Sequence, residues 1–265
     1  MDISKQSSIA KHLGSARQNK RIVKRPPDEL TPSDQNEAYQ AMKTLHNWFS
    51  DNGLGENAGY KIGCTTAVQQ AHVGFDQPLG GGVLSKLVYS QNVNLSSNEY
   101  RRIGIETELA VRLKSSPPIN NAPYDCDSIA RYVGEIMAAL EIVDDRYDDY
   151  PSWPVESLIA DDFFNAGCVL GKPFSPETVD LKEVSATTTV NGIEHGSGRG
   201  VDVMGHPYKA LSHLVNTLAA AGISILEGEL VLTGSLVQTH WTKHPGTNYL
   251  CSYSKPFGDL QVFVE

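Results

Sequence analysis

The sequence has few cysteines, and none of them are close together. Of its 265 residues only four are cysteine, without a Cys-x-x-Cys pair and with no leader-like segment ahead of them. This usage argues against a disulfide-stabilised scaffold and against a zinc site built on cysteine pairs. It favours free thiols in a reducing compartment, so we expect a cytoplasmic protein.

Long apolar runs and a surplus of positive charge are also missing. No apolar stretch reaches the roughly 18 residues of a membrane-spanning helix. Acidic residues outnumber basic ones by 31 to 22, which gives a net charge of -9, and the basic run at residues 20–25 is short. Neither a membrane nor a nucleic acid is therefore an expected partner. The hydrophobic content of 40% is enough for a folded core.

Residues 103–111, Ile-Gly-Ile-Glu-Thr-Glu-Leu-Ala-Val, place two acids in an alternating apolar pattern. Glu106 and Glu108 occupy even positions, and the larger apolar side chains occupy odd ones, which is typical of a strand with one apolar face. The two carboxylates then point the same way and repel unless a cation, a proton or an arginine lies between them. Oxygen ligands of this kind suit Mg²⁺ or Mn²⁺. A solvated strand face is the alternative.

A third acid, Glu141, lies inside the apolar run 136–143, which is typical of a buried strand. An unpaired carboxylate there is costly, so it needs a partner. That partner is either a metal ion shared with the two strand carboxylates or a basic side chain. The candidates for an ion pair are Lys61, Arg101 and Arg102. The residues alone leave both explanations open.

The chain divides into an N-terminal helical part and a β-rich remainder. A helix is predicted to begin at Pro32, after a Thr31 cap, and to end near Gly53, because apolar residues then recur at helical spacing. Residues 9–16 predict a weaker helix. We expect an α-helical cap over residues 1–58 and a catalytic domain over residues 59–265.

Short apolar runs separated by glycine, proline and asparagine follow. Residues 59–66 predict a strand that carries Lys61, whose amine either reaches solvent or serves a site. Residues 74–82 are expected to form a loop, and residues 125–136 a helix. Residues 161–164, two acids followed by two phenylalanines, predict a pocket wall or an apolar corner capped by aspartate.

The last hundred residues are mostly β. Asn191-Gly192 predicts a tight hairpin, and a helix should open at Pro207 and close at Gly222. Short strands with few helices favour a rolled or sandwiched sheet over βαβ repeats, which places the chain in the α+β class.

A set of short motifs, in this order, resembles the 2-keto-4-pentenoate hydratase and 4-oxalocrotonate decarboxylase family of the fumarylacetoacetate hydrolase superfamily. The similarity covers nearly the whole chain. The motifs are Gly59-Tyr60-Lys61-Ile62-Gly63, Glu106-Thr107-Glu108, Leu140-Glu141-Ile142-Val143-Asp144, Ala160-Asp161, Asn191-Gly192, Gly205-His206-Pro207 and Leu232-Thr233-Gly234-Ser235.

The resemblance implies a mixed β-roll or barrel of the fumarylacetoacetate hydrolase C-terminal type, with a small N-terminal helical region. It implies one Mg²⁺ or Mn²⁺ on Glu106, Glu108 and Glu141, which decides between the metal site and the ion pair. The substrate would be a small 2-oxo or 2-hydroxydienoic acid of aromatic catabolism. The cation would polarise its carbonyl and stabilise the enolate while water adds to the conjugated double bond. A homo-oligomer is also implied.

The resemblance further implies roles for individual residues. Lys61 matches the family lysine and is assigned proton transfer or substrate-oxygen binding, with a lowered pKa. Asp161 is the second catalytic candidate. The candidates for substrate binding are Leu79, Asp162, Phe163, Phe164 and Ser235.

Departures from the family pattern keep other reactions in view. Leu79-Gly80-Gly81 stands where hydratases that resemble this chain carry Asp-Phe/Tyr-Gly, which favours a decarboxylase, whereas Gly234-Ser235 resembles the hydratase ending. Asp162-Phe163-Phe164 replaces an asparagine and small residues, so the pocket wall should be bulkier. A C–C hydrolase would need a His/Glu pair, for which His72 is the candidate. A non-catalytic binding or assembly subunit is also possible on this fold; a metal-dependent hydratase is the primary prediction.

Overall fold

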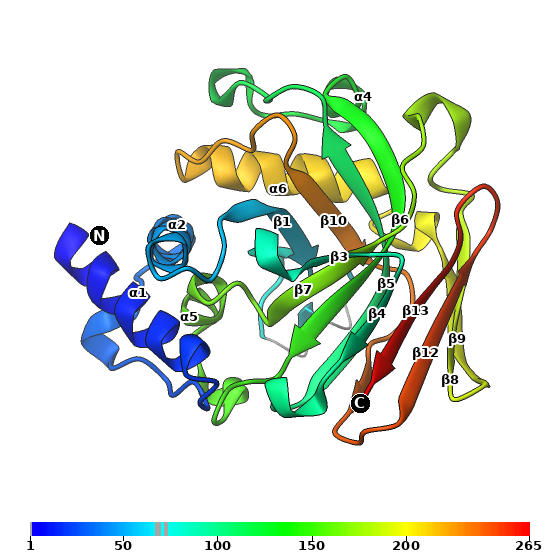
Figure 1. Cartoon of the computed structure of the whole chain (residues 1–265). Helices are drawn as coiled ribbons and strands as arrows, with labels where there is room; N and C mark the ends of the chain where they lie inside the picture. Colours follow the sequence, from blue (N-terminus) through cyan, green and yellow to red (C-terminus); the bar gives the residue numbers. More distant parts are fainter. Residues whose placement is uncertain (1, 67–69, 72–73) are drawn as a thin grey trace.

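Two β-sheets form the centre of the molecule. The computed structural model describes residues 2–66, 70–71 and 74–265 (Figure 1). The first sheet runs in the order β2 (Leu79–Leu84), β1 (Asn57–Gly63), β10 (Leu230–Ser235), β5 (Ile103–Leu113), β6 (Val133–Asp144), β7 (Asn165–Leu170) and β3 (Val88–Ser90), with β11 (His240–Thr242) paired to β5. The second runs β4 (Asn92–Leu95), β13 (Gly258–Val264), β12 (Thr247–Tyr253), β8 (Ser185–Val190) and β9 (Ile193–Arg199).

The two sheets pack against each other through β5 and β6 of the first sheet. The hydroxyls of Thr107 and Thr188 hydrogen-bond across the interface, and Tyr253 donates to the carbonyl of Ala139 at 2.6 Å. Thr107 therefore points to the second sheet, and the even-numbered residues beside it point away from that sheet. The mixed β-roll is confirmed, and the strands in the described part of the chain form no closed barrel.

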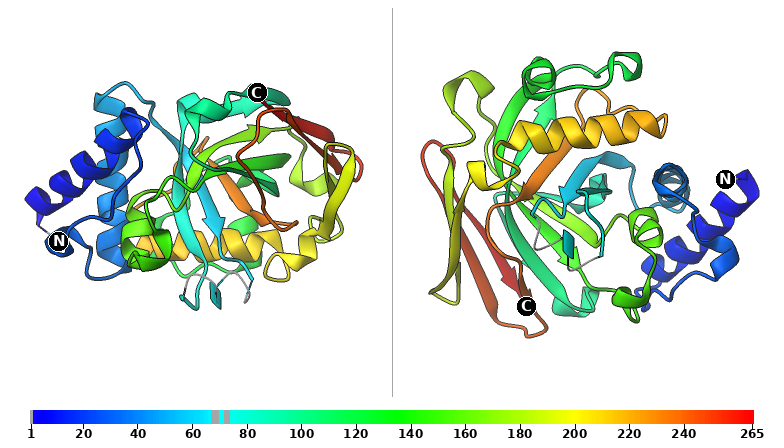
Figure 2. Two further views of the ribbon diagram at one scale, coloured as in Figure 1. Left: turned by 90° about the horizontal axis from the view of Figure 1, so that it is seen from below. Right: turned by 180° about the vertical axis from the view of Figure 1, so that it is seen from behind.

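Five helices of the described residues surround the first sheet. They are α1 (Ile3–Gln18), α2 (Gln35–Asp51), α4 (Cys126–Ala130), α5 (Val155–Ala160) and α6 (Pro207–Ala220). Figure 2 shows α1 and α2 side by side at the end of the molecule opposite the second sheet. The two helices approach closely at Gly14, where an added Cβ would lie 2.3 Å from the Trp48 ring. Helix α2 also packs on α5. Arg17 of α1 and His46 of α2 both contact Asp162, which lies in the segment that follows α5.

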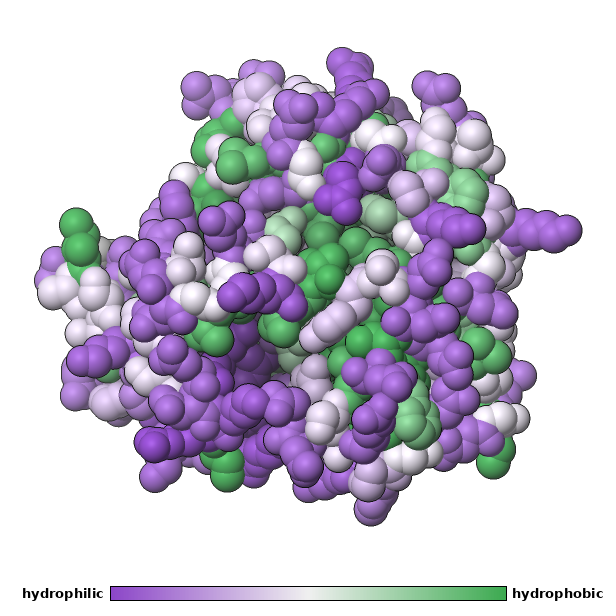
Figure 3. All heavy atoms as spheres, in the orientation of Figure 1, coloured by the Kyte–Doolittle hydropathy of each residue, from purple (hydrophilic) through white to green (hydrophobic). Residues whose placement is uncertain are grey.

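One face of the molecule carries apolar side chains near its centre, surrounded by hydrophilic ones (Figure 3). Within the described ranges, no helix combines the length and the apolar character needed to cross a membrane.

Several elements are as predicted. The acidic strand, the apolar run and the Lys61 strand are β5, β6 and β1. Asn191 and Gly192 have φ angles of 52° and 80°, as the predicted tight hairpin requires. Helix α6 begins at Pro207. Helix α2 begins three residues later than predicted, at Gln35, because Asp34 accepts the backbone N–H of Glu37 as its cap.

Two predictions were wrong. The helix predicted over residues 125–136 is only five residues long: α4 has a capping box that joins Asp125 and Ser128, and it ends at Ala130. Strand β6 begins at Val133. The apolar spacing suits a helix, but pairing with both β5 and β7 stabilises the strand. The expected loop at residues 74–82 ends at Leu79, where β2 pairs with β1. The division at residue 58 stays a prediction.

Candidate metal centre

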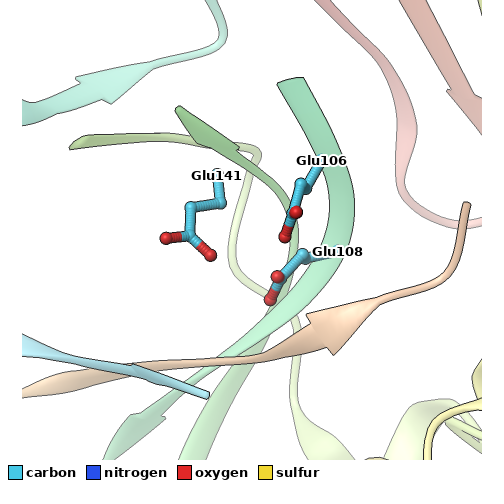
Figure 4. A group of neighbouring side chains, drawn as sticks. All are labelled: Glu106, Glu108 and Glu141. Carbon is cyan, nitrogen blue, oxygen red and sulfur yellow. The ribbon is translucent and has the colours of Figure 1, made fainter. Parts of the chain in front are cut away.

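Three carboxylates meet where β5 and β6 pair. Glu106 lies directly opposite Glu141 in the antiparallel ladder, and Glu108 follows two residues along β5. One carboxylate oxygen from each residue lies within 4.8 Å of the other two, and Figure 4 shows the three carboxyl groups gathered in one space. Glu108 and Glu141 are fully buried and Glu106 is half-buried. The register of two neighbouring strands therefore creates the cluster.

Each carboxylate has one oxygen held by a donor. The backbone N–H of Gly234 donates to Glu108 Oε2 at 2.8 Å, and the Asn165 amide donates to Glu141 Oε1 at 2.9 Å. The Thr239 hydroxyl donates to Glu106 Oε1.

The buried oxygens Glu108 Oε1 and Glu141 Oε2 have no hydrogen-bond partner in the described part of the chain. Unpaired buried anionic oxygens are costly unless a cation lies between them. Three carboxylates at this separation are a donor set that suits a hard divalent cation. The residues therefore fit a metal ion.

The pKa values of the cluster point the same way. Burial raises the pKa of Glu108 well above its usual range, and the negative charges of Glu141 and Glu106 raise it further. Burial also raises the pKa of Glu141 to about 7, against the lowering effect of Lys61. The protein environment therefore disfavours three ionised carboxylates together, and a divalent cation would reverse that balance.

Lys61 completes the cluster from β1. The residue is only 2% exposed, its Nζ lies 3.1 Å from Glu141 Oε1, and the same atom lies 5.0 Å from the centre of the Phe163 ring. Burial alone would lower the pKa of Lys61, but the charges of Glu141, Glu106 and Glu108 raise it. The lowered pKa expected from the sequence requires a cation beside the lysine, and it stays a prediction. Lys61 is the ion-pair partner of Glu141, whereas Arg102 pairs with Asp145.

A cavity of about 570 Å³ opens beside the carboxylates. Its lining residues are Lys61, Gly63, Cys64, Ala71, Arg102, Glu106, Val143, Asp145, Tyr150, Phe163, Phe164, Ser235, Gln238, Thr239 and Trp241. Five predicted site residues thus reach one space: the lysine, one carboxylate, both phenylalanines and Ser235. The hydrocarbon surface of the phenylalanines, Val143 and Trp241 suits the carbon chain of a small organic acid.

Three other predicted residues are not brought to this cavity. Leu79 is fully buried in β2, and Asp161 and Asp162 are fully buried under the N-terminal helices. Asp161 lies 3.5 Å from Arg17 and 3.7 Å from Arg146. Asp161 is therefore placed between two arginines and outside the described lining of the cavity, and its catalytic role stays a prediction.

Asp162 anchors the cavity wall. Its Oδ1 accepts from His46 Nε2 at 2.6 Å and from the Gly82 N–H at 2.9 Å, and its Oδ2 accepts from Arg17 at 2.7 Å. Burial alone would raise the pKa of Asp162, but the charges and hydrogen bonds of His46 and Arg17 hold it well below its usual range. The two residues that follow, Phe163 and Phe164, line the cavity.

Sequence reasoning missed several residues of the site and of its support. Asn165 and Thr239 hold carboxylates, and Arg17 and His46 lie 145 and 116 residues from Asp162 in the chain. No local pattern signals contacts over that separation. Arg102 could have been found, because it shares the even-numbered alternation of Glu106 and Glu108.

The comparison with protein-family models gives one match to this chain. Residues 83–253 match the model described as fumarylacetoacetate (FAA) hydrolase C-terminal. The matched range includes Glu106, Glu108 and Glu141 and begins after Lys61.

Similar proteins of known activity and structure were also found. A 2-hydroxyhexa-2,4-dienoate hydratase of Comamonas testosteroni is 32% identical over 184 residues, 67% of each chain. A 2-oxo-hept-4-ene-1,7-dioate hydratase of Escherichia coli is 28% identical over 186 residues, 68% of this chain and 69% of the other. The structure of 4-oxalocrotonate decarboxylase from Pseudomonas putida G7, complexed with magnesium and adipate, superposes with a TM-score of 0.90 at 21% identity over 100% of this chain and 99% of the other.

Proposed function

Because the chain belongs to the fumarylacetoacetate hydrolase C-terminal family, we propose that it is a divalent-metal-dependent lyase acting on a small 2-oxo or 2-hydroxydienoic acid. Within that class it is a hydratase, which adds water across a conjugated double bond. The observation that carries this proposal is the carboxylate cluster, which has two unpartnered buried oxygens beside a cavity that contains a buried lysine. The relatives named as hydratases support the reaction type.

The residues of the cavity have different roles in the proposed reaction. Glu106, Glu108 and Glu141 hold Mg²⁺ or Mn²⁺, which when bound supplies Lewis-acid polarisation of the 2-oxo group. Lys61 donates a hydrogen bond to a substrate oxygen and transfers a proton between its amine and the substrate. Hydration joins the hydroxyl of water to one carbon of the double bond and a proton to its neighbour, so a group that holds and returns protons is needed. The two phenylalanines exclude bulk water from the carbon chain.

A decarboxylase is the second candidate, because Leu79 occupies the position where hydratases that resemble this chain carry an acid. Its side chain is fully buried, and Glu106 and Asp145 are the acids among the described residues of the cavity lining. A C–C hydrolase stays a further alternative. Its candidate base, His72, lies outside the described residues, and His46 is bound to Asp162. The intact carboxylate cluster argues against a non-catalytic subunit.

The test is metal-dependent loss of dienoate absorbance by the purified protein, with products followed by mass. Gain of one water identifies a hydratase, and release of CO₂ identifies a decarboxylase. We expect the double variant Glu106→Gln/Glu108→Gln to lose both activity and metal-dependent thermal stabilisation, because it removes two of the three anionic ligands. Its circular dichroism should be unchanged.

Glu135→Gln is the matched control, since Glu135 lies on β6 with a side chain 43% exposed and pairs with Arg112 rather than with the cluster. Full activity in the double variant would end the metal-site proposal.

We also propose that the protein is cytoplasmic, forms a homo-oligomer, and binds neither nucleic acid nor membrane. Apolar side chains gather near the centre of one face, and such a grouping on the surface supports association (Figure 3). The mass in solution, measured by light scattering, tests the oligomer; a monomer at working concentration would contradict it.

A further inference from the structure

An arginine lies at the far end of the row that carries the metal-site carboxylates. Gly104 and Glu106 lie on one side of β5, and Arg102, the residue just before the strand, lines the same cavity as Glu106. Across the ladder, Gly104 pairs with Val143, and the Asp145 N–H donates to the Arg102 carbonyl at 3.0 Å. Two strand repeats place the backbone of Arg102 about 13 Å from that of Glu106.

The stretch between the two charged ends is uncharged and closely packed. A Cβ at Gly104 would lie 2.8 Å from Val143, 2.9 Å from Trp241 and 3.0 Å from Thr239. The absence of a side chain at Gly104 therefore lets these three residues approach the strand. All three line the cavity. One cavity thus extends from Glu106 and Lys61 to Arg102, and the walls between them suit a hydrocarbon chain.

The guanidinium of Arg102 is available to a ligand. It stacks at 5.0 Å from the centre of the Trp241 ring, and its one ion pair in the described structure, with Asp145, is 3.6 Å long. No side-chain hydrogen bond is formed by Arg102 among the described residues, and the side chain is 41% exposed. Five N–H donors in a planar fork match a carboxylate in two-point contact.

The approach to Arg102 from solvent also suits an anion. A surface groove of about 500 Å³ shares Arg102 and Trp241 with the cavity and is lined further by His240, Lys243 and His244. No aspartate or glutamate occurs among the described residues of its lining, although the whole chain has a net charge of -9. A groove whose described lining has no acids, on an acidic protein, favours the approach of anionic molecules to Arg102.

We propose that Arg102 binds a second, distal carboxylate, so that the substrates are 2-oxo dicarboxylates rather than 2-oxo monocarboxylates. The inference rests on the proposed function for the 2-oxo end of the molecule, which binds near Glu106 and Lys61. Arg102 is then the residue that determines specificity at the other end, with Trp241 holding its guanidinium plane in place.

The test measures binding of two unreactive analogues that differ only in the terminal carboxylate. Calorimetry with the Mg²⁺-supplied protein compares 2-oxohexanedioate with 2-oxohexanoate. We expect the dicarboxylate to bind about ten- to a hundred-fold more tightly, the range of a hydrogen-bonded charge pair. Arg102→Gln should reduce the preference to about three-fold or less, and Arg102→Met, which retains packing on Trp241, should do the same.

Lys243→Gln is the matched control, because it removes one positive charge from the outer groove and not from the cavity. It should keep the preference, which separates direct contact from long-range attraction. Equal binding of both analogues by the wild type, or an undiminished preference in both Arg102 variants, would overturn the proposal. Failure of the proposed function would differ from either result, since it is seen as absence of metal-dependent turnover of unsaturated 2-oxo acids of both kinds.

Discussion

The charges of Lys61 and of the three glutamates do not cancel. Lys61 is almost fully buried, and its ammonium pairs with Glu141. Three ionised carboxylates and one ammonium leave two negative charges, which a divalent cation neutralises. The burial-raised pKa values of Glu108 and Glu141 express the same imbalance. Lys61 is not one of the anionic ligands of the cluster, so it can serve the substrate while the three carboxylates hold the cation.

Because the carboxylates hold the metal and Lys61 serves the substrate, the variant Lys61→Ala should affect turnover and metal binding differently. Turnover should fall by about a hundred- to ten-thousand-fold, the usual contribution of a proton-transfer group. Affinity for Mn²⁺ should change little, because all three anionic ligands remain. Steady-state kinetics and metal titration measure the two effects independently.

Lys86→Ala is the control, since Lys86 is exposed and its amine donates to the Gly53 carbonyl. An unchanged rate in Lys61→Ala would return Lys61 to a structural role.

The residue-scale predictions from sequence were good where they used strand alternation. The pattern around Glu106 and Glu108 places both carboxylates on one side of the strand, and the structure has them there. The same pattern could not place Asp161 and Asp162, because burial under distant helices decides where they point. Their partner Arg17 has no signal in the local sequence.

At the scale of elements, the N-terminal helices fix the wall of the cavity. Asp162, Phe163 and Phe164 have φ angles of 61°, 43° and 69°, a left-handed run without glycine. Each such residue costs about 1–2 kcal/mol, so the surrounding structure must hold the segment. Arg17 comes from α1 and His46 from α2, and both bind the Asp162 carboxylate. The two helices thereby hold the segment that presents both phenylalanines to the cavity.

Asp162→Asn tests this anchor. At pH 7 the substitution should lower the free energy of unfolding by about 3–5 kcal/mol, because it leaves buried positive charge without its partner. The native pKa of Asp162 is below its ordinary value, so its contribution is present above about pH 4 and is lost as pH falls through the native pKa. Urea unfolding across pH should therefore show the difference from wild type shrinking in acid.

Asp28→Asn is the matched control, because the Asp28 carboxylate is 87% exposed and pairs with Arg25 on the surface. It should change stability by less than about 1 kcal/mol. Equal stability of Asp162→Asn and wild type at pH 7 would show that the anchor does not hold the wall.

The predicted loop at residues 74–82 was partly wrong because contacts with distant elements, rather than the local sequence, determine the structure there. The glycines at 80–82 favour a loop in the sequence, yet β2 needs them. An added Cβ would lie 2.2 Å from the Asp162 carbonyl at Gly81 and 2.0 Å from the His46 ring at Gly82. Close approach of neighbouring elements, rather than a turn, requires glycine at these positions. The residues themselves do not reveal which reason applies.

For the whole molecule, the site draws on strands and loops from Lys61 to Trp241, and the structure joins them by mixed pairing within one sheet. Strand patterns and the family motifs predicted that sheet class and the acids of the cluster. The contacts that could not be predicted from the sequence are those between the sheet and the N-terminal helices. They depend on packing of the complete chain.

The most direct measurement is anomalous diffraction from crystals grown with Mn²⁺. One anomalous peak is predicted, with oxygens of Glu106, Glu108 and Glu141 all within coordination distance, and it should vanish in Glu106→Gln/Glu108→Gln crystals. A peak elsewhere, or none at saturating Mn²⁺ with the three carboxylates in their present arrangement, would contradict the account.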